Sequence, residues 1–146
     1  MNSLIITCPN CKTKNRIPTG KQHLSPKCGK CSKQIEIKAQ ALPVELADAE
    51  FQSFIAETQL PLMVDFYSPT CGPCQAIAPV ITALSKDYLG KVIIAKIDTS
   101  KNPGTAMHYK IRGVPSLLFF NNGQLIDQIV GALPEHQLRQ KLDAMR

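Results

Sequence analysis

Three cysteine pairs, each of the form Cys-x-x-Cys, constrain this 146-residue chain more than any other feature. All six cysteines belong to them, at positions 8/11, 28/31 and 71/74. Such regular spacing favours metal and redox sites in a reducing compartment over the disulfide framework of a secreted protein. We therefore expect a cytoplasmic protein.

The distribution of charge divides the chain into two unlike parts. Residues 1–40 hold eight Lys and Arg side chains against one acid, whereas residues 41–146 hold nine against ten. The formal charges are therefore +7 and −1, which account for the net charge of +6. Because a short neutral stretch ending in proline separates the parts, we expect a small module at 1–38, a linker at 39–43 and a second domain at 44–146.

Neither hydropathy nor the N-terminal residues indicate a membrane or export. No apolar stretch approaches the roughly 20 residues that a membrane helix needs. Residues 1–7 have neither the basic segment nor the long apolar segment of a secretory signal peptide. We expect no membrane attachment and no secretion.

The first two cysteine pairs predict a structural zinc site. Cys8, Cys11, Cys28 and Cys31 have the spacing Cys-x2-Cys-x16-Cys-x2-Cys, which is typical of one zinc ion held by four thiolates. With all four positions filled by sulfur, this ion has no catalytic role, and we expect His23 at the surface rather than as a ligand. Short strands predicted at 3–7 and 34–38 make this module a zinc ribbon.

The second part has the pattern of an α/β domain. Apolar strands joined by a helix predict a parallel βαβ unit, and Asn122-Gly123 predicts an antiparallel hairpin. The expected elements are a helix at 48–58 with Asp48 as its N-cap, strands at 62–67 and 91–97 around a helix at 74–88, a short helix at 102–109, strands at 116–120 and 124–130, and a closing helix at 134–145.

The third pair, Cys71 and Cys74, lies between a predicted strand and a predicted helix. Backbone N–H groups and the dipole at the start of the helix favour the thiolate of Cys71, which is the nucleophilic form. Cys74, one turn later and more buried, is expected to resolve the resulting mixed disulfide. The alternatives are a structural disulfide and half of a metal site.

Residues from about 43 to 146 resemble the thioredoxin family, and a zinc ribbon ahead of them resembles one bacterial branch of that family. The resemblance rests on segments that occur in the same order and at matching separations. They are Val64-Asp65-Phe66, Cys71-Gly72-Pro73-Cys74, Pro79, and the segments 95–98, 102–106, 111–115, 122–123 and 130–132.

The resemblance implies a thioredoxin fold, with a mixed sheet flanked by helices, and the activity of a protein-disulfide reductase. Cys71 and Cys74 are then a redox-active disulfide that thioredoxin reductase and NADPH restore to the dithiol. The substrates are disulfide-containing proteins, and the chain itself binds no nicotinamide or flavin.

Asp65 is the candidate proton acceptor. Its position inside an apolar strand penalises the charged carboxylate and raises its pKa, and the resemblance implies that it takes the proton of Cys74. Lys96, on the adjacent strand, is expected to pair with Asp65 and to moderate that shift. The alternative is a core carboxylate that is merely hydrogen-bonded.

A shallow contact surface for the substrate is expected around the dithiol. The loop at Val114-Pro115 resembles the one that faces the dithiol in thioredoxins. It is a setting in which a cis X-Pro bond can occur, although trans is the default from sequence alone. The family usually has tryptophans where this chain has Tyr67 and Thr70, which changes the rim of the dithiol. The expected contact residues are Thr70, Gly72, Pro73, Ile111, Gly113, Val114, Pro115 and Gly131.

A second hypothesis makes the chain a zinc-ribbon adaptor or a redox-controlled holdase, in which the second domain only docks. An intermediate hypothesis is that oxidants strip zinc from the ribbon and form disulfides that change its activity. The basic ribbon permits an anionic or protein partner, although its lysines can equally serve solubility alone. Residues 1–40 contain no Phe, Tyr or Trp, so the aromatic stacking typical of nucleic-acid binding is missing and nucleic acid is disfavoured.

Overall fold

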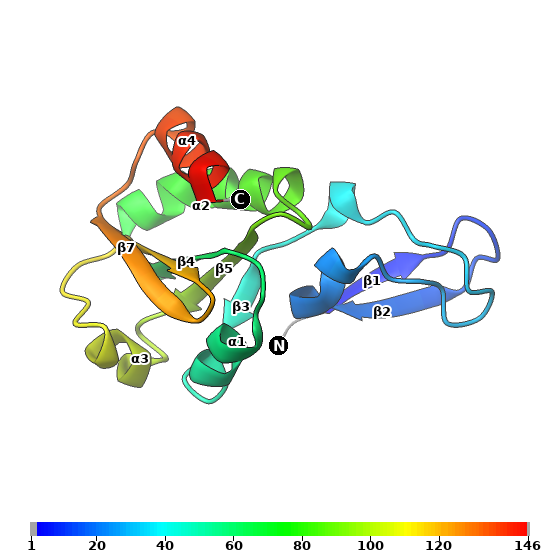
Figure 1. The fold of residues 1–146 in the computed structure, drawn as a ribbon, viewed down its shortest axis with the longest axis horizontal. Coiled ribbons are helices and arrows are strands. Elements are labelled where there is room, and N and C mark those ends of the chain that lie inside the picture. The colour runs from blue at the N-terminus through cyan, green and yellow to red at the C-terminus, as the bar shows by residue number, and fades with distance from the viewer. Residues whose placement is uncertain (1–2, 146) are drawn as a thin grey trace.

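The computed structural model describes residues 3–145, so residues 1–2 and 146 of the expected domains lie outside the described residues. It contains a two-stranded and a five-stranded sheet, which lie at opposite ends of an elongated molecule (Figure 1). We call residues 3–38 the ribbon and residues 44–145 the dithiol domain. None of the helices in the described part is both long and apolar enough to cross a membrane.

The five-stranded sheet has the order β3-β5-β4-β6-β7. Its central strand β4 (Leu62–Tyr67) pairs in parallel with β5 (Ile93–Asp98) and antiparallel with β6 (Ser116–Asn121). A strand with neighbours on both sides and helices on both faces is apolar along its whole length, which explains why β4 was recognised at its observed bounds. β3 (Val44–Leu46) is a parallel edge strand beside β5 that the sequence did not predict.

The other edge of the sheet is the predicted hairpin. β7 (Gln124–Val130) pairs antiparallel with β6 across the turn at Asn122-Gly123. Both turn residues have positive φ, 52° and 79°, as a two-residue turn between twisted strands requires.

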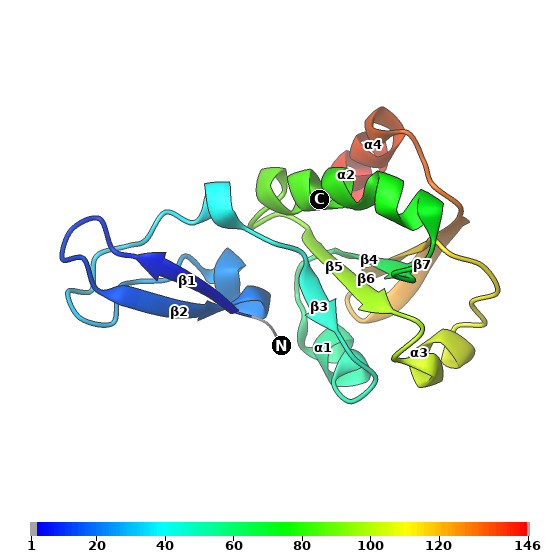
Figure 2. The same ribbon diagram turned by 180° about the vertical axis from the view of Figure 1, so that it is seen from behind.

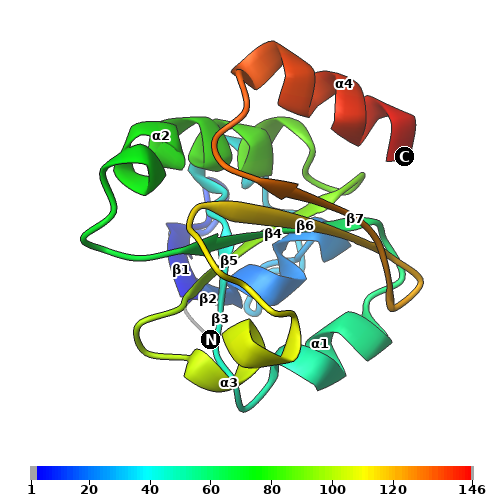
Figure 3. The same ribbon diagram turned by 90° about the vertical axis from the view of Figure 1, so that its left-hand side faces the viewer.

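Helices cover both faces of this sheet (Figure 3). On one face, α2 (Gly72–Asp87) and α4 (Glu135–Met145) pack over a cluster that includes Met63, Ile81, Leu84, Leu138 and Leu142. On the other face, α1 (Phe51–Glu57) and α3 (Pro103–His108) flank a cluster that includes Phe51, Ile55, Phe66 and Phe120. The predicted mixed sheet with flanking helices is confirmed.

The predicted N-cap role of Asp48 is wrong. Helix α1 begins at Phe51, and Glu50 is its N-cap residue without a side-chain hydrogen bond. The Asp48 carboxylate instead accepts hydrogen bonds from the backbone N–H groups of Gly104 and Thr105, at 3.0 and 2.8 Å. A short acidic side chain caps the helix start that it meets in space, and here that is α3, more than fifty residues away.

The ribbon is built on an antiparallel hairpin of β1 (Ser3–Thr7) and β2 (Lys14–Pro18). The predicted strand at 34–38 is wrong, because this segment makes a single bridge, from Gln34 to Lys27, and then enters a 3-10 helix, η2 (Lys38–Gln40). Its alternation reflects burial of Ile35 and Ile37 in the small ribbon core, together with Ile6 and Ile17. Alternating burial does not by itself supply a pairing partner.

The ribbon joins the dithiol domain at the C-terminal end of α2, the end remote from Cys71 (Figure 2). The 3-10 helix η1 (Thr19–Leu24) holds the linker, because the Gln22 amide donates to the Leu42 carbonyl at 2.6 Å and accepts from the Leu42 N–H at 3.4 Å. Leu89, just after α2, packs against the apolar core of the ribbon.

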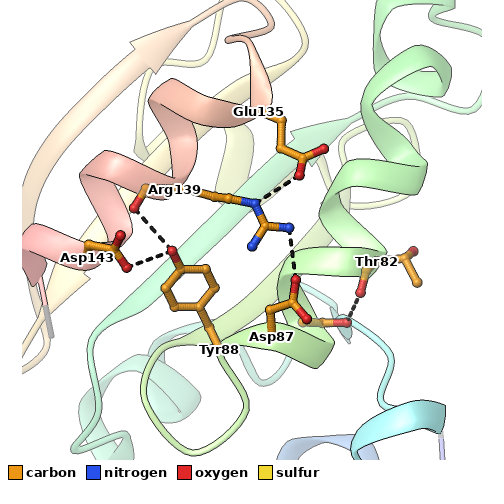
Figure 4. Close-up of polar contacts among 7 residues, drawn as sticks. Thr82, Asp87, Tyr88, Glu135, Arg139 and Asp143 are labelled. Atoms are coloured by element: carbon orange, nitrogen blue, oxygen red, sulfur yellow. Dashed lines mark hydrogen bonds and ion pairs between the residues drawn. The ribbon is translucent and has the colours of Figure 1, made fainter.

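A polar network ties α4 to the end of α2 (Figure 4). The buried Tyr88 hydroxyl lies 2.8 Å from an Asp143 carboxylate oxygen and 3.1 Å from the Arg139 carbonyl. The Arg139 guanidinium contacts both Glu135 and Asp87 at 2.9 Å. The Arg139 ion pairs are partly exposed and contribute little, so the Tyr88 hydroxyl is the stronger of these links.

We predict that Tyr88→Phe lowers the free energy of unfolding by about 1 kcal/mol, because the hydroxyl partners lose a buried hydrogen bond. Urea denaturation measures this change. Tyr109→Phe is the matched control, because the hydrogen bond that its hydroxyl accepts from Gln52 is exposed and its loss has little effect. Equal destabilisation by the two substitutions contradicts the assigned role of Tyr88.

Candidate functional site

Cys71 is the N-cap of α2, and Gly72 and Pro73 form the first turn of the helix behind it. The backbone N–H of Cys74 points at the Cys71 sulfur, with N and Sγ 3.1 Å apart. The two cysteines form a disulfide with their Cα atoms 5.2 Å apart. When the bond is reduced, N–H groups at the start of a helix stabilise a thiolate at this position.

Exposure distinguishes the two sulfurs. Cys71 is partly exposed, whereas Cys74 is only 4% exposed and lies beneath it. An incoming disulfide therefore meets Cys71 first. This is the arrangement expected from the position of the pair at a strand-to-helix junction.

Asp65 lies in the middle of β4 and is only 3% exposed. Among the described residues its Oδ1 atom has no hydrogen-bond partner, so little compensates for loss of water around its charge. Burial accordingly raises the pKa of the Asp65 carboxyl to about 7, from an ordinary value of 3.8. A group with this pKa can take up and release a proton near neutral pH.

A cavity of about 120 Å³ connects Asp65 with the buried cysteine. Asp65, Cys74 and Lys96 all line it, as do Tyr67 and Ser68. It is large enough to hold water molecules. Because Cys74 and Asp65 both line it, water held there can carry a proton between them.

Lys96 is the neighbour of Asp65 in the register of β4 and β5, as expected. Its charge lowers the pKa of Asp65, but by less than burial raises it. The ion pair that Lys96 forms is with Glu45 on β3, at 3.8 Å. Lys96 thus moderates the pKa of Asp65 through its charge, while its ion pair is with Glu45 of the edge strand β3, which the sequence did not predict.

The loop at Val114-Pro115 faces the dithiol and has a cis peptide bond. The carbonyl oxygen of Val114 lies 3.6 Å from the Cys71 sulfur, and the N–H of Gly131 donates to the Pro115 carbonyl at 2.8 Å. These contacts bring Val114, Pro115 and Gly131 to the dithiol. Thr70, Gly72, Pro73 and Gly113 are exposed, and Ile111 is partly buried against the core beside α1.

Four sulfurs meet in the ribbon. The Sγ atoms of Cys8, Cys11, Cys28 and Cys31 all lie within 4.8 Å of one another, and the Cys8–Cys31 and Cys11–Cys28 distances are 3.7 and 3.5 Å. A tetrahedral zinc ion with Zn–S bonds of about 2.3 Å needs sulfurs about 3.8 Å apart. The four side chains therefore fit a zinc ion.

Two similar turns support this cluster. In each, the N–H of the residue four positions after the first cysteine, Lys12 or Ser32, donates to the carbonyl of that cysteine at 2.9 Å. Both residues have positive φ, 66° and 65°. The chain thus folds back twice in the same way and presents two sulfurs each time.

Neighbouring amides orient the sulfurs, and sequence reasoning did not find them. The Asn10 amide lies 3.5 Å from the Cys31 sulfur, and the Asn15 amide lies 3.5 Å from that of Cys28. The pKa of Cys28 falls to about 6, chiefly through the backbone N–H of Cys31 and then through Asn15. The amides thus favour the thiolate that binds metal. His23 is partly buried and is not a member of the cluster.

The pKa of Asp65 predicts a pH-dependent stability. Because the folded value of about 7 lies above the ordinary 3.8, the contribution of this group is full below about pH 3.8 and is lost as the pH rises through 7. An asparagine at this position does not titrate, so we expect the free energy of unfolding of Asp65→Asn to rise relative to that of the wild type between pH 4 and pH 8, by on the order of 4 kcal/mol. Denaturation of the disulfide form at both pH values measures this difference.

The exposed Glu57 provides the control for that measurement. Glu57→Gln leaves the difference from the wild type unchanged between the two pH values. If the difference in free energy of unfolding between Asp65→Asn and the wild type is also the same at both pH values, the raised pKa of Asp65 is contradicted.

Comparison with known proteins agrees with this geometry. The family model described as Thioredoxin matches residues 42–144, and the one described as Thioredoxin 2, N-terminal, matches residues 7–33. Thioredoxin C-3 of Corynebacterium nephridii is 35% identical over 140 residues, which cover 96% of this chain and 94% of that protein.

Other relatives match the dithiol domain. Thioredoxin 2 of Chlorobaculum tepidum is 44% identical over 99 residues, which cover 68% of this chain and 91% of that protein. The thioredoxin of Synechocystis sp. is 42% identical over 99 residues, covering 68% and 92%. With a four-cysteine ribbon ahead of its dithiol domain, this chain belongs to the thioredoxin family of thiol-disulfide oxidoreductases.

Proposed function

We propose that the protein is a protein-disulfide reductase. The observation that carries the proposal is the disulfide between a partly exposed Cys71 and a buried Cys74, together with one cavity that both Cys74 and the Asp65 carboxyl line. The Cys71 thiolate attacks one sulfur of a substrate disulfide, forms a mixed disulfide and displaces the first substrate thiolate. Val114, Gly131 and the exposed residues beside Cys71 form the surface against which the substrate lies, and the buried Pro115 supports that surface from below.

Cys74 then resolves the mixed disulfide. Its thiol gives its proton to the Asp65 carboxylate through the cavity, and the resulting thiolate attacks the Cys71 sulfur. The Cys71–Cys74 disulfide forms and the second substrate thiolate leaves, so two electrons pass from the dithiol to the substrate. Lys96, which also lines the cavity, tunes the proton affinity of Asp65.

Recycling needs an external source of two electrons. A flavin- and NADPH-dependent thioredoxin reductase restores the dithiol, and the chain itself binds neither cofactor. A dithiol reductant and a thiolate cluster both persist best in a reducing compartment, so we assign the protein to the cytoplasm.

The ribbon has a structural role in this proposal. Cys8, Cys11, Cys28 and Cys31 hold one zinc ion, and all four coordination positions are filled by sulfur. The chain then consists of a zinc ribbon at 1–38, a linker at 39–43 and a thioredoxin domain at 44–146.

Insulin reduction with NADPH and thioredoxin reductase tests the function. We expect turnover by the wild type and complete loss in Cys71→Ser, which lacks the attacking sulfur. Cys74→Ser attacks once and remains as a mixed disulfide that mass spectrometry detects, because nothing resolves it. A wild type as inactive as Cys71→Ser overturns the proposal and leaves the adaptor or holdase hypothesis.

Loss of one ribbon thiolate tests the zinc site. We expect Cys28→Ser to lower the zinc content from one ion per chain to well below one, and to make residues 3–38 sensitive to protease, since metal binding supplies much of the folding energy of such modules. Insulin reduction persists, because the dithiol lies at the other end of α2. Cys71→Ser is the control and keeps its zinc; equal zinc in both variants contradicts the assignment.

A further inference from the structure

Three charged side chains form a row across the sheet beneath the dithiol. The register pairs Glu45 of β3 with Lys96 of β5, and Lys96 with Asp65 of β4. Residues paired in this way project from the same face of a sheet, which here is the face covered by α2. One ammonium group therefore stands between two carboxyl groups.

Lys96 forms its ion pair with Glu45. Its Oε1 atom lies 3.8 Å from the Lys96 nitrogen, whereas Asp65 Oδ1 has no hydrogen-bond partner among residues 3–145. The Tyr67 hydroxyl, which burial keeps protonated by raising its pKa, lies 3.0 Å from both oxygens of Glu45. These contacts fix the carboxylate of Glu45 in place.

Tyr67 also holds the lysine directly. The Lys96 nitrogen lies 5.3 Å from the centre of the Tyr67 ring, within the range of a cation–π interaction. Lys96 is thus held by the carboxylate of Glu45, on the side of β5 remote from Asp65, and by the ring of Tyr67, two residues along β4 from Asp65.

We propose that Glu45 is a positioning residue, which together with Tyr67 keeps the Lys96 ammonium from neutralising Asp65 and so leaves the buried carboxyl able to accept and return a proton. The inference rests on the proposed role of Asp65 in the resolving step. Glu45 itself touches neither the sulfurs nor the substrate and acts through Lys96.

The groups around Asp65 account for the direction of the effect. Among residues 3–145, the titratable side chains around Asp65 are those of Glu45 on β3, Lys96 on β5, Tyr67 on β4 and Cys74 on α2. The neighbouring strand β6 presents the apolar Leu117. After burial, which raises the pKa of Asp65 most, Lys96 lowers it and Glu45 raises it. Loss of the Glu45 charge therefore makes Asp65 a stronger acid.

Glu45→Gln tests the inference, because it removes the charge, keeps the shape and lies at a partly exposed position that tolerates the change. We expect the midpoint of the Asp65 titration, followed by carboxyl carbon NMR of the full-length protein, to fall by about one pH unit. At pH 6 the ionised fraction of Asp65 then rises roughly fivefold. An unchanged midpoint overturns the inference.

A double-mutant cycle separates positioning from direct repulsion. If Glu45 acts through Lys96, its replacement moves the midpoint at most half as far in a Lys96→Gln background as in the wild type. An equal movement in both backgrounds shows that Glu45 acts only by its own charge, and overturns the positioning role. Glu57→Gln, at an exposed site on α1, is the matched control and leaves the midpoint unchanged.

Asp65→Asn distinguishes failure of the inference from failure of the proposed function. If this variant resolves a mixed disulfide as fast as the wild type, Asp65 has no role in that step and the proposed proton transfer fails. If it resolves slowly while Glu45→Gln leaves the titration unmoved, the proton transfer stands and the role of Glu45 is overturned.

Discussion

Burial of the central strand β4 is the constraint on which the redox site depends. Its backbone forms hydrogen bonds with β5 on one side and β6 on the other, and helices cover both of its faces. The strand ends four residues before Cys71, so the position of the attacking sulfur is set by a rigid element. The same burial leaves the Asp65 carboxyl short of polar partners, and its high proton affinity follows from that shortage.

The ribbon and the dithiol domain obtain their order from different sources. The dithiol domain has two apolar clusters, one on each face of its sheet. The ribbon has a small core of Ile6, Ile17, Ile35 and Ile37 beside its cysteines, which is little against the entropy of ordering so many residues. The four clustered cysteines, which we propose hold one zinc ion, supply the remaining constraint. The Gln22–Leu42 hydrogen bonds then tie the ribbon to the linker.

Local patterns predicted most of this structure. A continuous apolar run predicted β4, and Asn122-Gly123 predicted the β6–β7 hairpin. Asp65 was a candidate proton acceptor because it is a charged residue inside an apolar strand. β2 was missed because its polar sequence lacks strand alternation, and β3 because three residues carry too little pattern. The contact of Glu45 with Lys96 was also missed, since it depends on the register of that unrecognised strand. Contacts between distant segments, such as Asp48 with the start of α3, leave no mark in local sequence.

The ribbon docks at the end of α2 opposite to the one where the dithiol begins. This helix has 16 residues, which correspond to a length of about 24 Å. A molecule much shorter than this span contacts either the four-cysteine ribbon or the Cys71 sulfur, but not both at once. Only a macromolecule is long enough to contact both ends of α2 at once, and the length of this helix sets the distance between its two points of contact.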